Sequence, residues 1–280
     1  MGAAAVAAPW LVRRPLEAAA SATPLERVGI QLYSVRSLLA QDFDGTLRAL
    51  AAIGYREVEF AGWHGRTPAQ VKTAVAAAGL AAPSAHVDLA SFRTDPARLC
   101  GEHAEAGHRA VVIAWMSPAE RKTLDDWRRR AEEFTRFAEA ARRAGLAFGY
   151  HNHEFEFVPV EGTVPFEVLA SATDPALVTL ELDLYWATVA GADPLAWMRR
   201  WPGRVTMVHV KDRSADGRMV DVGAGTIEVS CGGVRWNVPF EGARAREAVD
   251  VAQQLPPHPG CDVYELSLGA VWWAEPTAAP

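Results

Sequence analysis

The sequence is poor in cysteine and has no excess of positive charge. Its three cysteines, Cys100, Cys231 and Cys261, lie far apart, and no CxxC pair occurs among the 280 residues. This spacing argues against a disulfide framework and against a zinc–thiolate site. The formal net charge is −6, so the chain lacks the basic surface with which nucleic-acid-binding proteins neutralise phosphates. We therefore expect no nucleic acid as a partner.

Two further patterns are missing. No apolar run approaches the roughly 20 residues that a membrane-spanning helix needs, and we therefore expect no membrane partner. No GxGxxG motif opens the first expected helix, where Tyr33-Ser34-Val35-Arg36 stands instead. A dinucleotide-binding fold needs those glycines for close approach to a pyrophosphate, so this class of protein is disfavoured.

Residues 1–24 differ in composition from the rest of the chain. An apolar stretch, MGAAAVAAPWLV (1–12), precedes Arg13 and Arg14, and a small-x-small pattern ends at Ala22. This order resembles the second half of a secretory signal, but the positive segment that should precede the apolar stretch is missing. Two interpretations stay open: an exported, periplasmic protein, or a cytoplasmic protein with an attached leader. We expect residues 25–280 to form a single domain.

Short β-type runs alternate with helical stretches from residue 28 onward. The expected strands are Val28–Tyr33, Glu57–Phe60, Ala81–His86, Ala110–Trp115, Leu146–His151, Val178–Asp183 and Val205–Val210. The expected helices include Phe43–Ile53, Ala69–Ala78, Ala97–Ala106 and Asp125–Ala144. Glycines that can adopt the left-handed conformation close several helices, at Gly54, Gly79, Gly107 and Gly145. Regular repetition of βα units favours a (β/α)₈ TIM barrel over an open doubly wound sheet.

The pattern weakens after residue 227. Only Asp262–Leu266 resembles an eighth strand, and the preceding stretch is rich in glycine and proline. We therefore expect the last βα units, within 228–280, to be atypical or incomplete.

Ionisable and polar side chains gather where the expected strands end. In a parallel barrel the active site forms at the carboxyl ends of the strands. The residues concerned are Glu59, His86, His151, Asn152, His153, Asp183, His209, Lys211 and, in the eighth strand, Glu265. A single aspartate at a strand end often only caps the next helix. The convergence of nine ionisable and polar residues on one end of the barrel instead indicates a functional site. Asp, His and Glu without thiolate suit Mn²⁺, Mg²⁺, Co²⁺ or Zn²⁺. Such an ion polarises a sugar carbonyl and stabilises an enediolate.

Five motifs, in order along the chain, resemble one family. They are GIQLYSVR (29–36), GYREVEFAG (54–62), FGYHNHEFEF (148–157), ELDLYWATVAGADP (181–194) and RVTMVHVKD (204–212). Together they resemble the sugar phosphate isomerase/epimerase family of xylose-isomerase-like TIM barrels, in the branch with a YHNHxxEF motif. The resemblance implies a metal-dependent enzyme that acts on a small sugar or keto-sugar through an enediolate. It is also compatible with a homodimer.

The resemblance also implies which residues hold the ion. The family takes Glu, Asp, His and Glu from the ends of strands five to eight. Asp183 and His209 match the middle two, and His151 stands where many relatives have the first Glu. Glu265, in VYELS, is the remaining candidate for the fourth ligand. A histidine at strand five changes the proton transfers open to the site. An isomerase, a dehydratase and a 3-keto-sugar lyase or hydrolase therefore all stay open, as does a catalytically inactive carbohydrate-binding barrel.

The remaining candidates surround this predicted site. Because side chains alternate along a strand, His151 and His153 point the same way and Asn152 points the other way. Lys211 is expected either to neutralise an oxyanion or substrate anion, or to be a solvated strand-end lysine. The catalytic candidates are His153, Glu156, Lys211 and Glu59, with His153 and Glu156 also as alternative ligands. The substrate-binding candidates are His86, Trp63, Trp186 and Asn152.

Overall fold

The computed structural model describes residues 29–220 and the short stretches 229–231, 234–236 and 270–271. Three predicted features lie outside the described residues: the leader (1–24), the eighth strand at Asp262–Leu266, and its Glu265. Across the part that the structure describes, no helix is both long enough and apolar enough to cross a membrane.

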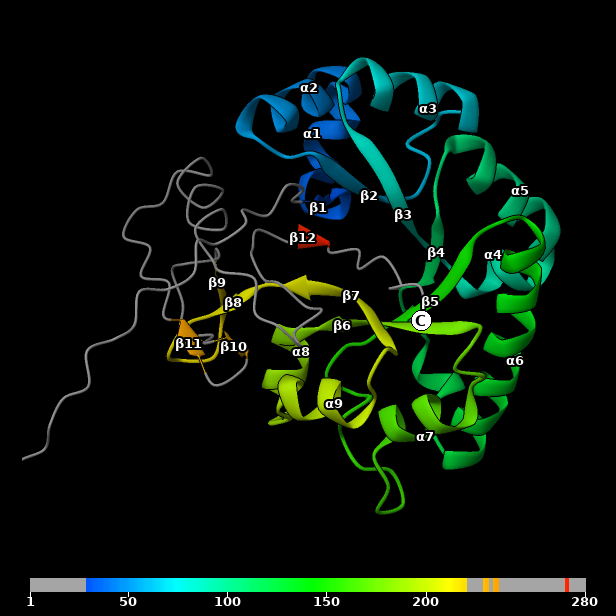
Figure 1. Cartoon of the computed structure of the whole chain (residues 1–280), viewed down its shortest axis with the longest axis vertical. Coiled ribbons are helices and arrows are strands. Elements are labelled where there is room, and N and C mark those ends of the chain that lie inside the picture. Colours follow the sequence, from blue (N-terminus) through cyan, green and yellow to red (C-terminus); the bar gives the residue numbers. More distant parts are fainter. Residues whose placement is uncertain (1–28, 221–228, 232–233, 237–269, 272–280) are drawn as a thin grey trace, which may run out of the picture.

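Seven parallel strands make up the frame of the molecule. They are β1 (Gly29–Gln31), β2 (Glu57–Ala61), β3 (Ala81–Val87), β4 (Ala110–Ile113), β5 (Ala147–His151), β6 (Val178–Asp183) and β7 (Val205–Val210). Each strand pairs in parallel with the next one along the chain. Figure 1 shows the strands as a curled sheet with helices around its outer side. This arrangement confirms the predicted barrel class.

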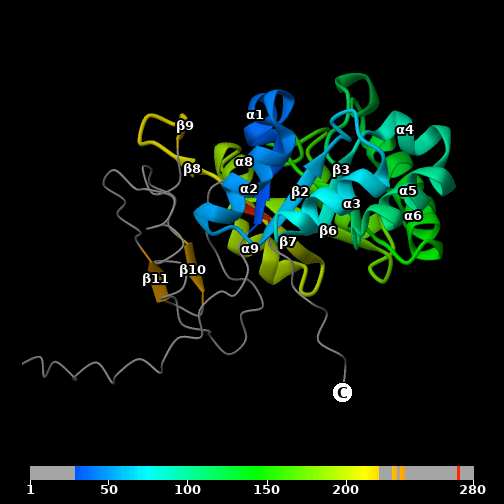
Figure 2. The ribbon, with the colours of Figure 1, turned by 90° about the horizontal axis from the view of Figure 1, so that it is seen from above.

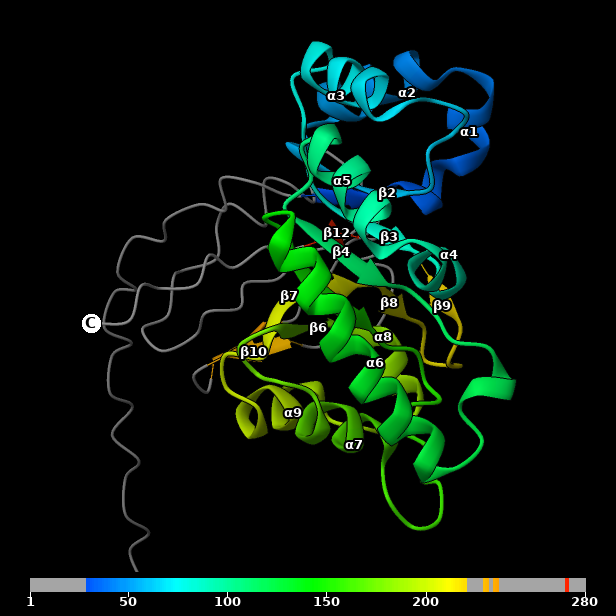
Figure 3. The same cartoon turned by 90° about the vertical axis from the view of Figure 1, so that its right-hand side faces the viewer.

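Helices connect the strands on the outside. They are α1 (Arg36–Gln41), α2 (Phe43–Ile53), α3 (Pro68–Ala77), α4 (Leu89–Thr94), α5 (Pro96–Ala106), α6 (Leu124–Arg143), α7 (Pro165–Ala172), α8 (Leu184–Val189) and α9 (Pro194–Arg200), with 3₁₀ turns η1 (Leu32–Val35) and η2 (Pro118–Glu120). Figure 3 shows α3, α5, α6 and α7 following one another over the outside of the strands. The four predicted helices all form, and the four predicted closing glycines all have positive φ angles.

The strand beside β7 has the opposite direction to that expected. This strand, β12 (Ala270–Val271), pairs antiparallel with β7, so that Ala270 faces Val210 and Val271 faces His209. Figure 1 shows β12 between β7 and β1. It pairs an edge that would otherwise be open, but a regular barrel would place a parallel strand there. The predicted atypical closure is therefore present in the described residues as a short antiparallel strand.

Two small antiparallel pairs stand apart from the main sheet. The hairpin of β8 (Asp212–Arg213) and β9 (Met219–Val220) continues directly from the carboxyl end of β7 (Figure 2). The other pair consists of β10 (Val229–Cys231) and β11 (Val234–Trp236). The first hairpin matters for the site because it follows Lys211 at once.

A core of aromatic rings lies between α6 and the sheet. Phe134 is fully buried, and its ring centroid lies 5.1 Å from that of Tyr150 and 5.7 Å from that of Phe148. We expect Phe134→Ala to lower the free energy of unfolding by about 3–5 kcal/mol, because it removes a large buried ring and leaves a cavity. Urea denaturation at neutral pH measures this. Glu139→Ala, on the exposed face of α6, is the control, and equal losses in both variants would contradict this description of the core.

Candidate metal centre

Two buried histidines lie at the centre of the candidate site. His151 ends β5 and His209 lies in β7; they are 3% and 2% exposed, and their ring centroids are 4.6 Å apart. In each ring one nitrogen faces Asp183 and the other faces a group deeper in the barrel. We call Glu59, His86 and Glu181 the deep network. Glu181 and Glu59 contact the histidine nitrogens that face away from Asp183, and Glu181 precedes Asp183 by two residues on β6. We call His151 Nε2, Asp183 Oδ2 and His209 Nδ1 the rim set.

Glu59 anchors the deep network. Its carboxylate accepts hydrogen bonds from Gln31 Nε2 at 3.1 Å and from Ser84 Oγ at 2.6 Å. His209 Nε2 and His86 Nε2 both lie 2.9 Å from Glu59 Oε1. Burial alone raises the pKa of Glu59, but the charge of His86 and the hydrogen bonds from His209 and His86 bring it well below its ordinary value. Glu59 is therefore a buried carboxylate with donors on both oxygens.

His86 lies between two carboxylates. Its Nε2 is 2.6 Å from Glu181 Oε2 as well as 2.9 Å from Glu59 Oε1. Burial lowers the pKa of His86, but the charges of Glu59 and Glu181 outweigh that effect and raise it to about 10. Ligand atoms of His86, His151, Glu181 and His209 all lie within 4.8 Å of one another, as a metal site requires. A protonated His86, however, has no lone pair at the shared nitrogen and itself supplies the positive charge there.

The hydrogen bonds of the deep network fix which nitrogens remain free at the rim. His151 Nδ1 lies 3.0 Å from Glu181 Oε2, and His209 Nε2 lies 2.9 Å from Glu59 Oε1. Because an ionised carboxylate only accepts hydrogen bonds, we assign the ring protons to these two nitrogens. The other nitrogens, His151 Nε2 and His209 Nδ1, then carry lone pairs.

Two of the three separations in the rim set are those of ligands around one ion. Asp183 Oδ2 lies 3.8 Å from His151 Nε2 and 3.9 Å from His209 Nδ1. Ligands about 2.0–2.2 Å from a common ion stand roughly 3–4 Å apart. Asp183 Oδ1 accepts the backbone N–H of Trp186 at 2.9 Å and thereby caps α8, while Oδ2 accepts Lys211 Nζ at 2.5 Å. Asp183 therefore serves both as a helix cap and as part of the site.

The turn after β5 positions the remaining polar residues of the YHNHxxEF motif, Asn152, His153 and Glu156. Asn152 binds the backbone of Asp183, with Asp183 N–H donating to Asn152 Oδ1 at 2.8 Å. The two oxygens of Glu156 accept Tyr150 Oη–H at 2.5 Å and His153 N–H at 2.7 Å. Burial raises the pKa of Glu156 to about 8 and lowers that of His153 to about 4. His153 Nδ1 is buried and has no hydrogen-bond partner among the described residues, so this ring is available to another group.

The candidate substrate-binding residues separate into two places. Trp186 lies at the site: its ring centroid is 5.6 Å from that of His153 and 5.5 Å from Lys211 Nζ. Trp63 instead stacks on His103, with ring centroids 4.6 Å apart, and lies 6.1 Å from His108.

Glu181 is a residue of the site that was not among the predicted site residues. Glu181 is fully buried and contacts three site histidines. Because alternate residues of a strand share a face, its place two residues before Asp183 was the signal that could have revealed it.

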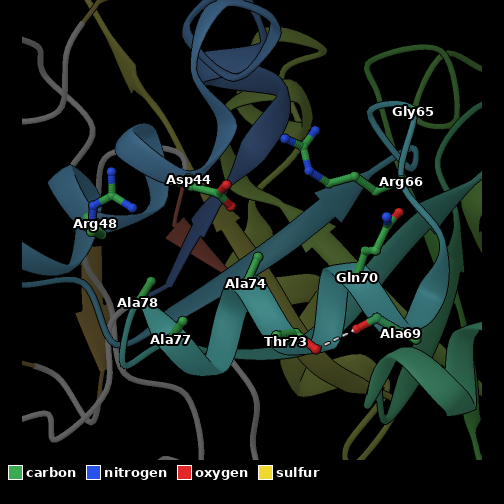
Figure 4. A pocket seen from close by; sticks show the side chains of 10 residues that line it. All are labelled: Asp44, Arg48, Gly65, Arg66, Ala69, Gln70, Thr73, Ala74, Ala77 and Ala78. Carbon is green, nitrogen blue, oxygen red and sulfur yellow. Dashed lines mark hydrogen bonds between the residues drawn. The ribbon is translucent and has the colours of Figure 1, made fainter.

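A surface pocket lies outside the barrel, away from the candidate metal centre. It has a volume of about 860 Å³ between α2 and α3, and its walls carry Arg48, Arg66 and Asp44 over several alanines (Figure 4). It shares no residue with the deep network or the rim set, so we assign it no part in the chemistry.

His103 and His108 form a buried pair that should make the fold sensitive to acid. Their Nδ1 atoms lie 2.8 Å apart, so one ring donates to the other and both are neutral. Burial lowers the pKa of His103 to about 3 and of His108 to about 4, below the value of about 6.5 in the unfolded chain. The unfolded chain therefore binds more protons, and the stabilisation present above pH 6.5 is lost as the pH falls toward 4.

The expected size of this effect is about 2 kcal/mol of unfolding free energy lost between pH 6 and pH 5, since two groups contribute. Urea denaturation at each pH measures it. In the variant with both residues changed, His103→Gln and His108→Gln, the dependence on pH should be shallower. An unchanged slope in that variant would show that the pair is not responsible.

Comparisons with known proteins bear on this geometry. No family model matches the chain. An inosose dehydratase of Lacticaseibacillus casei is 32% identical over 112 residues, which are 39% of this chain and 37% of that protein. One from Bacillus anthracis is 32% identical over 90 residues, 32% of this chain and 30% of that protein. The match thus spans only about a third of the length of these curated relatives.

Solved structures match over more of the chain. A sugar phosphate isomerase/epimerase from Parabacteroides distasonis is 29% identical, with a TM-score of 0.63 over 75% of this chain and 84% of that one. The IolI protein with a bound zinc atom is 11% identical, with a TM-score of 0.56 over 71% of this chain and 80% of that one. A probable 3-DHS dehydratase, AsbF from Bacillus anthracis, is 12% identical, with a TM-score of 0.55 over 71% and 84% of the two chains. The Parabacteroides neighbour confirms the predicted resemblance to sugar phosphate isomerase/epimerase proteins, and the other two structures share the fold.

Proposed function

We propose that this chain is a divalent-metal-dependent enzyme that isomerises or dehydrates a sugar-like polyhydroxy carbonyl compound. The observation that carries the proposal is the rim set, in which a buried carboxylate oxygen faces a free nitrogen of each of two histidines, at 3.8 Å and 3.9 Å. The deep network supports it, because it orients both imidazoles from behind as outer hydrogen bonds do in metal sites.

Three residues of the described chain would hold the ion: His151, Asp183 and His209. Glu265, which lies outside the described residues, stays our prediction for a fourth ligand. Mn²⁺, Mg²⁺, Co²⁺ and Zn²⁺ all accept such nitrogen and oxygen donors. When bound, the ion supplies Lewis-acid polarisation of a carbonyl oxygen and the neighbouring hydroxyl.

Three side chains beside the rim set would carry out the proton transfer, the charge stabilisation and the substrate contact. His153 is the residue that we propose takes a proton from the carbon next to the carbonyl, because its buried Nδ1 has no hydrogen-bond partner in the part of the chain that the structure describes. Negative charge then develops on the carbonyl oxygen, and the ammonium group of Lys211, 2.5 Å from Asp183, stabilises it. Trp186 offers a flat apolar wall for the C–H face of the substrate. Glu156 is the weaker candidate as base, since both its oxygens already accept hydrogen bonds.

Isomerisation and dehydration share this first proton transfer and differ afterwards. Delivery of the proton to the former carbonyl carbon, with a proton passing from one oxygen to the other, gives the isomer. Departure of the β-hydroxyl with a proton, as water, gives an unsaturated ketone. The names of the curated relatives support dehydration, and that of the Parabacteroides neighbour supports isomerisation or epimerisation. A 3-keto-sugar lyase or hydrolase would use the same step.

One experiment tests the shared step and separates the outcomes. The metal-supplied protein is incubated in D₂O with aldoses, ketoses and an inosose, and exchange of the proton beside the carbonyl is followed by NMR. We expect exchange that His153→Gln reduces by about 100-fold or more, as loss of a general base does. Ultraviolet absorbance of a conjugated product then identifies dehydration. Sugar binding without metal and without exchange would instead identify an inactive carbohydrate-binding barrel.

A further inference from the structure

The turn that leaves β5 contains two fully buried polar side chains. Asn152 and Glu156 are each 0% exposed, although they belong to a loop rather than to a strand or helix. Loops normally keep such groups in water, because a buried polar atom must find a partner. The hydrogen-bond partners of these two side chains therefore indicate what the turn does.

Asn152 joins the ends of two strands. Its Oδ1 accepts the backbone N–H of Asp183 at 2.8 Å, and its Nδ2 donates to the carbonyl oxygen of Asp183 at 3.3 Å. The last backbone pair of β5 and β6 is His151 with Glu181. The side-chain amide of Asn152 thus continues the hydrogen bonding between the two strands beyond their last backbone pair. It holds both backbone polar groups of Asp183, which we assign as a ligand.

Glu156 ties the turn to the strand behind it. One oxygen accepts Tyr150 Oη–H at 2.5 Å, the other accepts His153 N–H at 2.7 Å, and the backbone carbonyl of Glu156 accepts the N–H of Phe166 at 2.8 Å. The turn is thereby fastened to β5, to its own second residue, and to α7. Its geometry is set at both ends.

We propose that Asn152 and Glu156 are positioning residues that together form a clamp on the metal centre. Asn152 sets the separation of His151 and Asp183, which come from different strands, and Glu156 holds the backbone of His153 in place beside them. The inference rests on the proposed function, because it assigns to Asn152 the affinity of the rim set for a divalent ion and to Glu156 the placing of His153. Outer hydrogen bonds of this kind change metal affinity or activity about 10- to 100-fold in other metal sites.

Two substitutions at Asn152 separate the clamp from simple packing. In Asn152→Asp the side chain can still accept from Asp183 N–H, but it faces the Asp183 carbonyl with an oxygen in place of a donor. Asn152→Ser keeps a donor and an acceptor but is too short to reach both groups. The matched control is Thr173→Val, because the buried Thr173 hydroxyl, at the end of α7, donates to the Leu169 carbonyl and accepts from Arg204 and contacts neither Asn152 nor Asp183.

The test is a titration with Co²⁺, followed by the visible absorption of the bound ion and by thermal unfolding of the metal-free protein. We expect both Asn152 variants to bind Co²⁺ about 10- to 100-fold more weakly, with an altered spectrum, and Thr173→Val to lose stability while keeping the affinity and spectrum of the unaltered chain. Glu156→Leu, which leaves the N–H of His153 without its acceptor, should keep most of the Co²⁺ affinity and lose activity in the exchange assay.

The outcomes distinguish the two proposals. A folded Asn152→Ser protein with the Co²⁺ affinity and spectrum of the unaltered chain would refute the clamp and leave the proposed function standing. Failure of the unaltered chain to bind Co²⁺ at all would refute both.

Discussion

Asp183→Asn is expected to lose the bound ion and to lower turnover by more than about 100-fold, a larger loss than outer-shell changes cause, with little change in stability. Asparagine can still cap α8, since its side-chain oxygen can accept the N–H of Trp186 as Asp183 Oδ1 does at 2.9 Å. It cannot offer the ion an anionic oxygen beside the lone pairs of His151 and His209. The ion pair with Lys211 is also lost, but the Lys211 side chain is 23% exposed, so its ammonium group can turn toward water instead of remaining buried without a partner.

The matched control for this substitution is Asp193→Asn. Asp193 also caps a helix, accepting the N–H of Leu195 at 2.9 Å, but it is exposed and stands outside both the deep network and the rim set. Metal content after reconstitution and dialysis, together with turnover, is measured for both variants. Full metal content in Asp183→Asn would remove this residue from the ligand set.

Glu59→Gln is expected to be the most destabilising single change in the deep network. The substitution leaves His86 with one charged partner fewer in a fully buried place, and breaking a buried pair in this way costs about 3–5 kcal/mol. It also turns an amide N–H₂ toward groups that are themselves donors, since Gln31, Ser84 and His209 all donate to Glu59. We expect a loss of at least about 3 kcal/mol of unfolding free energy at pH 7.

Glu181→Gln provides the comparison. Burial and the charge of Glu59 raise the pKa of Glu181, whereas that of Glu59 lies well below its ordinary value. Replacing Glu181 by a neutral amide therefore removes a less strongly stabilised negative charge than replacing Glu59 does, and among the described residues Glu181 Oε1 has no hydrogen-bond partner to lose. Urea denaturation should show the smaller loss for Glu181→Gln. The reverse order would mean that the negative charge of the network resides chiefly on Glu181.

Much of the frame could be predicted because buried parallel strands have a clear signature. The bounds of β6, β7 and α2 agree with the sequence prediction, since apolar runs there end at Asp, Gly or Lys. The first strand is shorter than predicted. Gln31 accepts the N–H of Tyr33 at 2.6 Å and starts a 3₁₀ turn, and such a local hydrogen bond leaves no mark in the hydrophobic pattern.

The site could be predicted only in part, for a physical reason. Strand ends indicated Asp183, His151 and His209, because the topology brings those ends together. The strand pattern could not show which nitrogen of each histidine is free, since that depends on Glu59 and Glu181 in three dimensions. Likewise, a two-residue antiparallel strand such as β12 has no periodicity to detect.

The most direct test of the metal centre is a crystal grown with Mn²⁺ or Co²⁺ and measured at the absorption edge of that metal. We predict one anomalous peak within about 2.0–2.3 Å of His151 Nε2, Asp183 Oδ2 and His209 Nδ1. A peak among His86, Glu181 and the opposite nitrogens of the two histidines would contradict this account, as would the absence of any peak near Asp183.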